Sequence, residues 1–287
     1  MLKGYLIEKY NHMTGAYTCN RLVEEARKLD MDLQIIGVHD CLVSREGIYN
    51  EGRLLEKRDF VINRYKWGAC KDEINRLAEW CYNPLQAYNI YINKYQQVRN
   101  LHSEAFQIPD YLLGTSLCSW QALTDRLGCP VVAKGLESSM GEQICLLEKA
   151  EDLAELRQTY GKEKEWLFEE FIHTSFGRDM RFYSIRGQVV ACMERRSQGD
   201  FRANVALGAS VRPLEITPEI RQIAADIYRQ TRLDFLGIDL MYGEEKPYFC
   251  EINVMPGLEG IERASGVNVA RMILHTIQKD FEEDGCE

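Results

Sequence analysis

Hydrophobic and polar positions follow two different periods in the first part of the chain. Short apolar runs are typical of buried strands, and apolar residues three or four positions apart predict helices. Strands are expected at 3–8, 31–38 and 59–64, and helices at 18–29 and 71–81. This alternation predicts a small doubly wound α/β domain over residues 1–88. The segment contains no Gly-x-Gly-x-x-Gly motif, so nothing in it favours a dinucleotide site.

Beyond residue 88 the pattern changes to polar helices and half-buried, mainly antiparallel strands. Helices are expected at 93–106, 116–128, 150–161 and 217–231, strands at 130–136, 144–149, 166–172, 233–242 and 248–254, a hairpin at 179–196, and two helices at the end. Arg186 and Gly187 supply the turn of that hairpin, and Thr217 and Pro218 open a helix. We therefore expect a central subdomain at 89–165 and a C-terminal subdomain at 166–287.

Composition narrows the classes of protein. With 45% hydrophobic and 28% charged residues, the chain of 287 residues has a globular rather than a disordered composition. The net charge of −9 lacks the basic excess that general nucleic-acid binding requires. Charged residues interrupt every apolar run, so we expect no signal peptide, no membrane span and a cytoplasmic location. The ten cysteines form no Cys-x-x-Cys pair, which favours mostly buried, reduced thiols over disulfides or a zinc site.

Two strands near the end of the chain carry a candidate metal site. If their hairpin is centred near Glu245, Asp239 lies opposite Glu251, and Asn253 shares the face of Glu251. Two opposed acids repel unless a cation lies between them, and oxygen ligands of this kind suit Mg²⁺. The alternative is that these acids are solvent-facing strand ends. Because they interrupt apolar strands, the metal site is favoured.

Two lysines and a small-residue loop are candidates for binding phosphate. Lys134 ends an apolar strand and precedes the loop from Gly135 to Gly141, whose backbone N–H groups could cover phosphate oxygens. The loop is not a P-loop, and a lysine before a turn is commonly a solvated strand end. Lys94, taken alone, is expected to be a surface charge.

The segment from 169 to 202 combines acids inside an apolar strand with many arginines. The strand around Glu169 and Glu170 could hold an adenine edge, with Asp179 on the ribose hydroxyls, although an ordinary hairpin would look the same. The cations are Arg178, Arg181, Arg186, Arg195, Arg196 and Arg202, against Asp179, Glu194 and Asp200. This positive patch suits anionic substrates, and the alternative is the charged outer face of a sheet. The five histidines lack motif spacing and receive no catalytic role.

Together, Lys94, PVVAKGLESSMG, WLFEEFI, GRDMR, ERRSQGDFRAN, GIDL and EINVMPGLEGIE occur in an order that resembles ATP-grasp enzymes, most closely RimK-like peptide ligases. The resemblance covers about residues 88–280, and residues 1–88 resemble the α/β domain that precedes the ATP-binding module in that family. The implied fold class is therefore α/β (α+β), an ATP-grasp fold with an N-terminal doubly wound pre-ATP-grasp domain.

The resemblance also implies a role for each matching position. Lys94 and Lys134 would hold the phosphates of ATP, Ser138, Ser139 and Gly141 would belong to the phosphate lid, Glu169, Glu170 and Ile172 would line the adenine site, and Asp179 would meet the ribose. Asp239, Glu251 and Asn253 would bind two Mg²⁺ ions, with Mn²⁺ as an alternative and Glu251 bridging. Arg202 and Asn204 would lie beside the γ-phosphate and the reacting carboxylate, and Arg178, Arg195 and Arg196 are candidates for gripping the donor carboxylate.

The family chemistry requires no protein nucleophile. A substrate carboxylate attacks the γ-phosphate of ATP, and an amine then displaces phosphate from the acylphosphate to form an amide. The implied activity is an ADP-forming ligase that adds an amino acid such as glutamate to a carboxylate acceptor, which is a small acid, a peptide or a protein tail. A homo-oligomer would be compatible with the family. Residues 205–210 and Met255 depart from its pattern beside the acceptor pocket, which leaves the acceptor open. The alternative function is a non-catalytic ATP-binding regulator or scaffold, and an oxidoreductase is disfavoured by the missing glycine motif.

Overall fold

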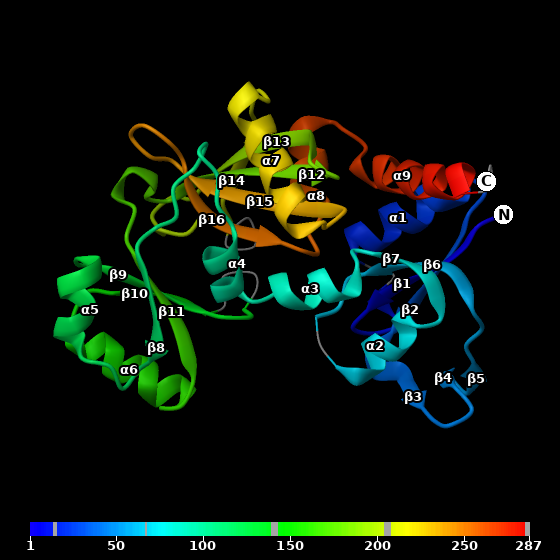
Figure 1. The fold of residues 1–287 in the computed structure, drawn as a ribbon, viewed down its shortest axis with the longest axis horizontal. Coiled ribbons are helices and arrows are strands. Elements are labelled where there is room, and N and C mark those ends of the chain that lie inside the picture. The colour runs from blue at the N-terminus through cyan, green and yellow to red at the C-terminus, as the bar shows by residue number, and fades with distance from the viewer. Residues whose placement is uncertain (14–15, 67, 139–142, 204–207, 285–287) are drawn as a thin grey trace.

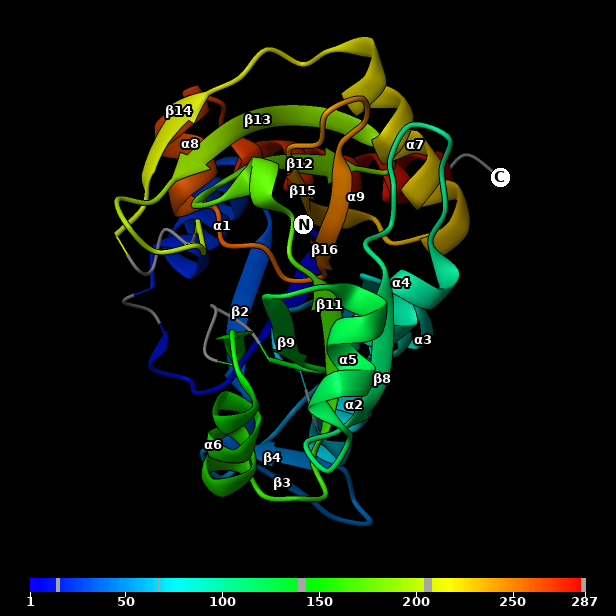
Figure 2. The same ribbon diagram turned by 90° about the vertical axis from the view of Figure 1, so that its left-hand side faces the viewer.

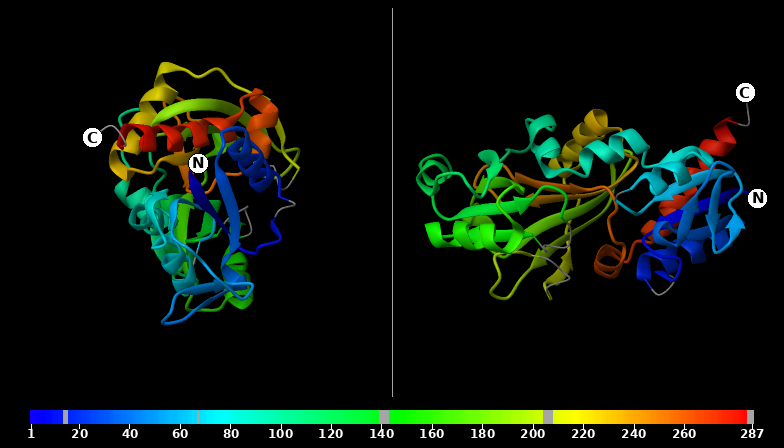
Figure 3. Two further views of the ribbon diagram at one scale, coloured as in Figure 1. Left: turned by 90° about the vertical axis from the view of Figure 1, so that its right-hand side faces the viewer. Right: turned by 90° about the horizontal axis from the view of Figure 1, so that it is seen from below.

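The computed structural model describes residues 1–13, 16–66, 68–138, 143–203 and 208–284. Three parts follow one another in space (Figure 1). The N-terminal domain and the central sheet lie at opposite ends of the long axis, and the largest sheet lies between them (Figure 3). Both termini lie at the end of the N-terminal domain. The α/β fold class is confirmed.

The N-terminal domain contains a parallel four-stranded sheet. Its strands, in order across the sheet, are β2 (Asp32–Gly37), β1 (Lys3–Glu8), β6 (Arg58–Asn63) and β7 (Ala78–Tyr82). Leu6 is opposite Ile35 on one side and Ile62 on the other. The strands read as continuous apolar runs because helices such as α1 (Tyr17–Lys28) cover a parallel sheet. The three expected strands and the first helix of this domain are confirmed.

The expected helix at 71–81 is wrong in its second half. Helix α2 (Ala69–Asn75) ends early, and β7 begins at Ala78. Phe60 is opposite Trp80 in the parallel pairing of β6 with β7, so the apolar residues of this segment complete the sheet and not a helix face. The domain also contains a small sheet that the pattern did not predict. It follows the 3₁₀ turn η2 (Val38–Asp40) and comprises β3 (Cys41–Val43), β4 (Ile48–Asn50) and β5 (Arg53–Leu54).

The helix expected at 93–106 is present only in its first half, as α4 (Lys94–Asn100). A further short helix that was not predicted, α3 (Leu85–Tyr91), precedes it. The Asn93 side chain accepts hydrogen bonds from the backbone N–H groups of Tyr95 and Gln96, which starts α4 at Lys94. The chain turns to an extended conformation at Leu101, so the polar stretch beyond it is not helical.

The central sheet separates a hydrophobic face from a polar face. Its order is β10 (Ile144–Leu147), β9 (Val131–Gly135), β11 (Glu165–Glu170) and β8 (Tyr111–Thr115), and β8 was not predicted. Helices α5 (Trp120–Leu127) and α6 (Ala150–Tyr160) lie beside this sheet (Figure 2). Their apolar side chains pack with Ala133, Trp166 and Phe168. Because side chains alternate along a strand, Lys134 and Glu169 lie on the opposite face. The boundary expected at 165 falls on the first residue of β11, which completes this sheet.

The largest sheet forms the C-terminal part. Its order is β14 (Ser210–Pro213), β13 (Gln188–Arg196), β12 (Arg178–Ile185), β15 (Phe235–Met241) and β16 (Tyr248–Asn253). Helix α7 (Pro218–Thr231) begins at the expected Thr217 cap and packs on Phe182 and Ile238. Helices α8 (Glu259–Ser265) and α9 (Val269–Asp284) return to the N-terminal domain, where α9 contacts α1. The hairpin turn at Arg186 and Gly187 is confirmed by left-handed φ angles of 48° and 78°.

The nine cysteines in the described ranges are free thiols, but only Cys19 and Cys192 are buried and Cys129 is exposed, so the expectation of mostly buried thiols is wrong. Within the described ranges, no helix is both long and apolar enough to span a membrane.

Candidate active site

A cavity of about 520 Å³ lies where the three parts meet. The polar face of the central sheet forms one wall, and the ends of β12, β13, β15 and β16 form another. Residues at the carboxyl ends of β1 and β6 of the N-terminal domain also line the cavity. Most of the site residues expected from the sequence therefore meet in one place.

The pairing expected for the candidate metal ligands is confirmed in the hairpin of β15 and β16, which is called the metal hairpin below. Asp239 is opposite Glu251, and Gly237 is opposite Asn253, so Asn253 follows Glu251 on the same strand face. The register shifts by one residue between Asp239 and Leu240. This irregularity moves the turn off the expected centre at Glu245, but it leaves the two carboxylates facing each other.

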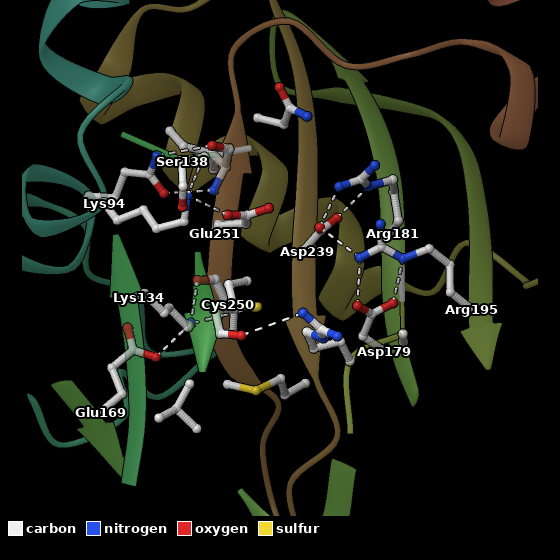
Figure 4. A pocket seen from close by; sticks show the side chains of 18 of the residues that line it. Lys94, Lys134, Ser138, Glu169, Asp179, Arg181, Arg195, Asp239, Cys250 and Glu251 are labelled. Atoms are coloured by element: carbon white, nitrogen blue, oxygen red, sulfur yellow. Dashed lines mark hydrogen bonds and ion pairs between the residues drawn. The ribbon is translucent and has the colours of Figure 1, made fainter. Parts of the chain in front are cut away.

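Asp239 is held by two arginines and is only 1% exposed. Nε and Nη2 of Arg181 donate to its two oxygens at 2.6 and 2.5 Å, and Nη2 of Arg195 donates at 2.7 Å (Figure 4). Burial alone would raise the pKa of Asp239, but the two guanidinium groups outweigh burial and lower it. Asp239 is therefore an ionised carboxylate in a fixed orientation.

Asp179 is part of the same network. Arg195 donates to its two oxygens at 2.7 and 2.5 Å, so Arg195 bridges Asp179 and Asp239. Both carboxylate oxygens that were expected to meet a ribose are thus engaged within the protein. Arg195, which we expected to grip a substrate carboxylate, orients two acids in this structure.

Lys94 is buried and not a surface charge. Its side chain is 7% exposed, and Nζ lies 3.2 Å from Oε2 of Glu251. The same Nζ donates to the carbonyl oxygen of Ser138 at 2.6 Å, which places the start of the phosphate loop beside the metal hairpin (Figure 4). The reading of Lys94 as solvated is corrected, because α4 begins at Lys94 and directs it toward β16.

Lys134 and Glu169 form a second buried pair, across β9 and β11. Nζ and Oε2 are 2.6 Å apart, and the two residues are 5% and 2% exposed. Lys134 is therefore not a solvated strand end. Burial raises the pKa of Glu169 even though Lys134 opposes the shift. Oε1 of Glu169 has no hydrogen-bond partner in the described part of the chain, so a polar acceptor remains available at this wall of the cavity.

The other expected residues differ in their placement. Ser138, Glu170, Ile172, Arg178 and Arg202 line the cavity. The Arg178 guanidinium stacks on the Tyr242 ring and donates to the Thr174 carbonyl oxygen, and Arg202 pairs with Asp200. Arg196 is exposed at the end of β13 and is not part of the lining, so its expected contact with the donor is not supported. Ser139, Gly141 and Asn204 lie outside the described residues.

Sequence reasoning missed some features of the cavity. Arg181 was named only as a cation of the positive patch, although it follows Asp179 by two positions, so strand periodicity could have placed both on the same face. Glu8 and Arg64 come from the N-terminal domain, for which the sequence predicted only a fold. The available signal at both positions was a charged residue at the last position of an expected apolar strand.

The residues present fit ATP with divalent metal. The ion pairs described above contain four carboxylates and four cations, so together they carry no formal net charge. The carboxylates are Asp179, Asp239, Glu169 and Glu251, and the cations are Lys94, Lys134, Arg181 and Arg195. ATP carries about four negative charges, and two divalent cations would preserve the balance. Among the described residues no three His, Cys, Asp or Glu side chains form a metal cluster, since the hairpin offers two carboxylates and an amide. Phosphate oxygens would complete the coordination.

Comparison with known proteins agrees with this geometry. The model of the RimK-like ATP-grasp domain matches residues 92–277. A probable alpha-L-glutamate ligase of Halorhodospira halophila is 30% identical over 281 residues, which are 92% of each chain. The ribosomal protein bS6–L-glutamate ligase of Escherichia coli O81 is 28% identical over 94% of each chain.

Solved structures show the same fold. The D-alanine–D-alanine ligase of Bacillus anthracis, determined with ATP, has a TM-score of 0.73 over 99% of this chain and 100% of that chain, at 17% identity. This likeness spans the N-terminal domain as well as the ATP-grasp part. The chain therefore belongs to the RimK-like ATP-grasp family and is an ADP-forming ligase that joins a carboxylate to an amine.

Proposed function

We propose that this ligase joins an amino acid to the carboxylate of a peptide, a protein tail or a small acid, with ATP and two Mg²⁺ ions in the cavity. The observation that carries the proposal is the pairing of Asp239 with Glu251 beside two buried lysines. Asp239, Glu251 and Asn253 would hold the metal ions, and Lys94 and Lys134 would bind phosphate oxygens. The metal ions would supply charge neutralisation at the transferred phosphoryl group.

The chain's own residues would act by position and charge. Arg181 and Arg195 keep Asp239 ionised and oriented toward the neighbouring strand. Lys94 and Lys134 are nearly enclosed, so their charges act in a poorly hydrated environment, where they stabilise phosphate charge more strongly than in water. Arg202 lines the same cavity and would lie near the reacting carboxylate. Aligning carboxylate, phosphate and amine supplies on the order of 7–11 kcal/mol.

The identity of the amino acid is proposed from the relatives. Two of them are named as glutamate ligases, one of which is named for ribosomal protein bS6. L-glutamate is therefore the first amino acid to test, and peptides that end in a free carboxylate are the first acceptors. The competing function is an ATP-binding regulator. The four ion pairs of the cavity would be sufficient for such a protein to bind ATP without catalysing a reaction.

The test is release of ADP with L-glutamate and a panel of acceptors, followed by mass measurement of the products. A gain equal to the amino acid minus water identifies the amide bond. Glu251→Gln should abolish ADP release, whereas Glu259→Gln serves as the matched control, because the Glu259 side chain at the start of α8 is exposed. Unchanged turnover in Glu251→Gln would contradict the metal assignment. Binding of ATP with Mg²⁺ but no ADP release across the panel would favour the regulator.

A further inference from the structure

The N-terminal domain presents a charged pair to the cavity. Glu8 is the last residue of β1, and Arg64 follows the last residue of β6. The two strands are neighbours in the sheet, and the N–H of Arg64 donates to the Ile7 carbonyl oxygen at 3.0 Å. Both side chains therefore leave the sheet at adjacent carboxyl ends.

This edge is the place where such sheets bind ligands. From β1 the chain adds β2 on one side, and it later adds β6 and β7 on the other side. The strand order thus reverses between β1 and β6. In open parallel sheets, ligands bind in the crevice outside the carboxyl ends of the strands at this reversal. Glu8 and Arg64 lie at that point, and both line the cavity that contains Glu251 and Asn253.

Protein groups fill only part of the hydrogen-bonding capacity of Glu8 and Arg64. Nε of Arg64 donates to Oε1 of Glu8 at 2.7 Å, Nη1 donates to the Pro256 carbonyl oxygen at 3.1 Å, and the Cys19 thiol donates to the same Oε1 at 3.1 Å. The hydrogen bonds of the pair use Oε1 of Glu8 and leave its second oxygen, Oε2, without one among the described residues, while Arg64 also interacts with the Cys19 thiol. The side chains of Glu8 and Arg64 are 7% and 16% exposed. An anionic acceptor thus remains beside the guanidinium group in a mostly enclosed place.

The complementary ligand carries both charges. A substrate with only a carboxylate would match Arg64 but would place a second negative charge beside Glu8, and a phosphate would do the same. The α-ammonium and α-carboxylate of a free amino acid match both groups at once. Burial and the charge of Glu8 raise the pKa of Cys19 to about 12, so this thiol stays protonated and adds no further charge to the pair.

We propose that Glu8 and Arg64 form the subsite for the head group of the amino-acid substrate, with Glu8 accepting an N–H of the amine and Arg64 binding the α-carboxylate. This inference rests on the proposed function and adds where the amine partner binds. The contact of Arg64 with Pro256 connects the subsite to the loop that follows Asn253, so the amine is held next to the metal hairpin. Glu8 and Arg64 are positioning residues for the attacking nitrogen.

The test measures ADP release while L-glutamate and ATP are varied separately. We expect Arg64→Lys, which keeps the charge but loses the planar fork, and Glu8→Gln to raise the KM for L-glutamate by about tenfold, with the KM for ATP within about twofold. Arg58→Lys is the matched control, because Arg58 begins the same strand at the opposite edge of the sheet and pairs with Asp32. Urea midpoints of all variants report on folding.

Two analogues separate the two halves of the head group. 4-Aminobutyrate is glutamate without its α-carboxylate, so the preference of the wild type for L-glutamate over 4-aminobutyrate should shrink about tenfold in Arg64→Lys. Glutarate lacks the amine, so its inhibition constant should not change in Glu8→Gln. An unchanged KM for L-glutamate, or equal changes for L-glutamate and ATP, would overturn the inference and leave the pair as a brace between β6 and Pro256. If the wild type releases no ADP with any of the common amino acids, the proposed function itself fails.

Discussion

Asp239→Asn tests whether the buried ion pairs and the metal site depend on the same carboxylate. The substitution keeps the shape of the side chain but removes its charge. It also replaces one acceptor oxygen by an NH₂ group that points at guanidinium N–H groups. Three hydrogen bonds, at 2.6, 2.5 and 2.7 Å, connect this carboxylate to Arg181 and Arg195.

The expected cost follows from what remains around the two arginines. Breaking a buried pair costs about 3–5 kcal/mol, because the remaining charge is left without a partner. Arg195 keeps both hydrogen bonds to Asp179, so most of the loss falls on Arg181, which has Asp239 as its salt-bridge partner. We therefore expect the free energy of unfolding to fall by about 3 kcal/mol, at the lower end of that range.

Urea unfolding followed by circular dichroism measures this loss, and ADP release measures function. The control is Asp239→Asn combined with Arg181→Met, which removes the unmatched charge together with its partner. We expect the double variant to recover most of the stability but no ADP release, because the metal ligand is still missing. Recovery of ADP release in the double variant would show that Asp239 serves only as the partner of Arg181. A single variant as stable as the wild type would refute the energetic reasoning.

Three further predictions concern charge and pH. Lys94→Met should raise the KM for ATP by about tenfold or more, measured by ADP release, because it removes a nearly enclosed cation beside Glu251. Chelation of divalent metal with EDTA should stop ADP release, and added Mg²⁺ should restore it, whereas activity that persists in EDTA would contradict the metal site. Arg212 and Tyr242 donate to Glu194 and lower its pKa, so its stabilisation is present above the unfolded-state value of about 4.3 and is lost as pH falls through the lower folded value. Glu194→Gln should therefore lower the free energy of unfolding at neutral pH, and urea unfolding should show the difference from the wild type shrinking in acid.

The pairing in the metal hairpin could be predicted because it depends on residues that are close together in the sequence. A short turn fixes which residues of two neighbouring strands are opposite each other, and period-two alternation then fixes the shared face. Asp239 and Glu251 interrupt otherwise apolar strands, so their spacing alone gave the correct pairing. The one-residue register shift beside Asp239 was not predictable, because a bulge leaves no mark in the hydrophobic pattern.

Burial by distant segments could not be predicted in the same way. Lys94 lies in a polar stretch and becomes buried only because Leu136, Ser138 and Glu251 reach it from other elements. The error at 71–81 has a related cause. The apolar residues around Trp80 fit a helix as well as a strand, and the parallel edge offered by β6 decided the outcome. Tertiary partners determined both results.

The balance of charge in the cavity explains how its buried charges can be compensated both in the free protein and with substrates bound. Each acid that would hold a metal ion already has a cation beside it, since Lys94 contacts Glu251 and Arg181 contacts Asp239. With the two metal ions that we propose, a nucleotide would add no net charge, so its binding would require an exchange of partners and would leave no uncompensated buried charge. In the proposed complex, Lys94 would pass from the Ser138 carbonyl oxygen to a phosphate, and Glu251 would pass from Lys94 to a metal ion. Arg195 keeps its contacts with Asp179 and Asp239, so the frame that orients the hairpin stays in place during that exchange.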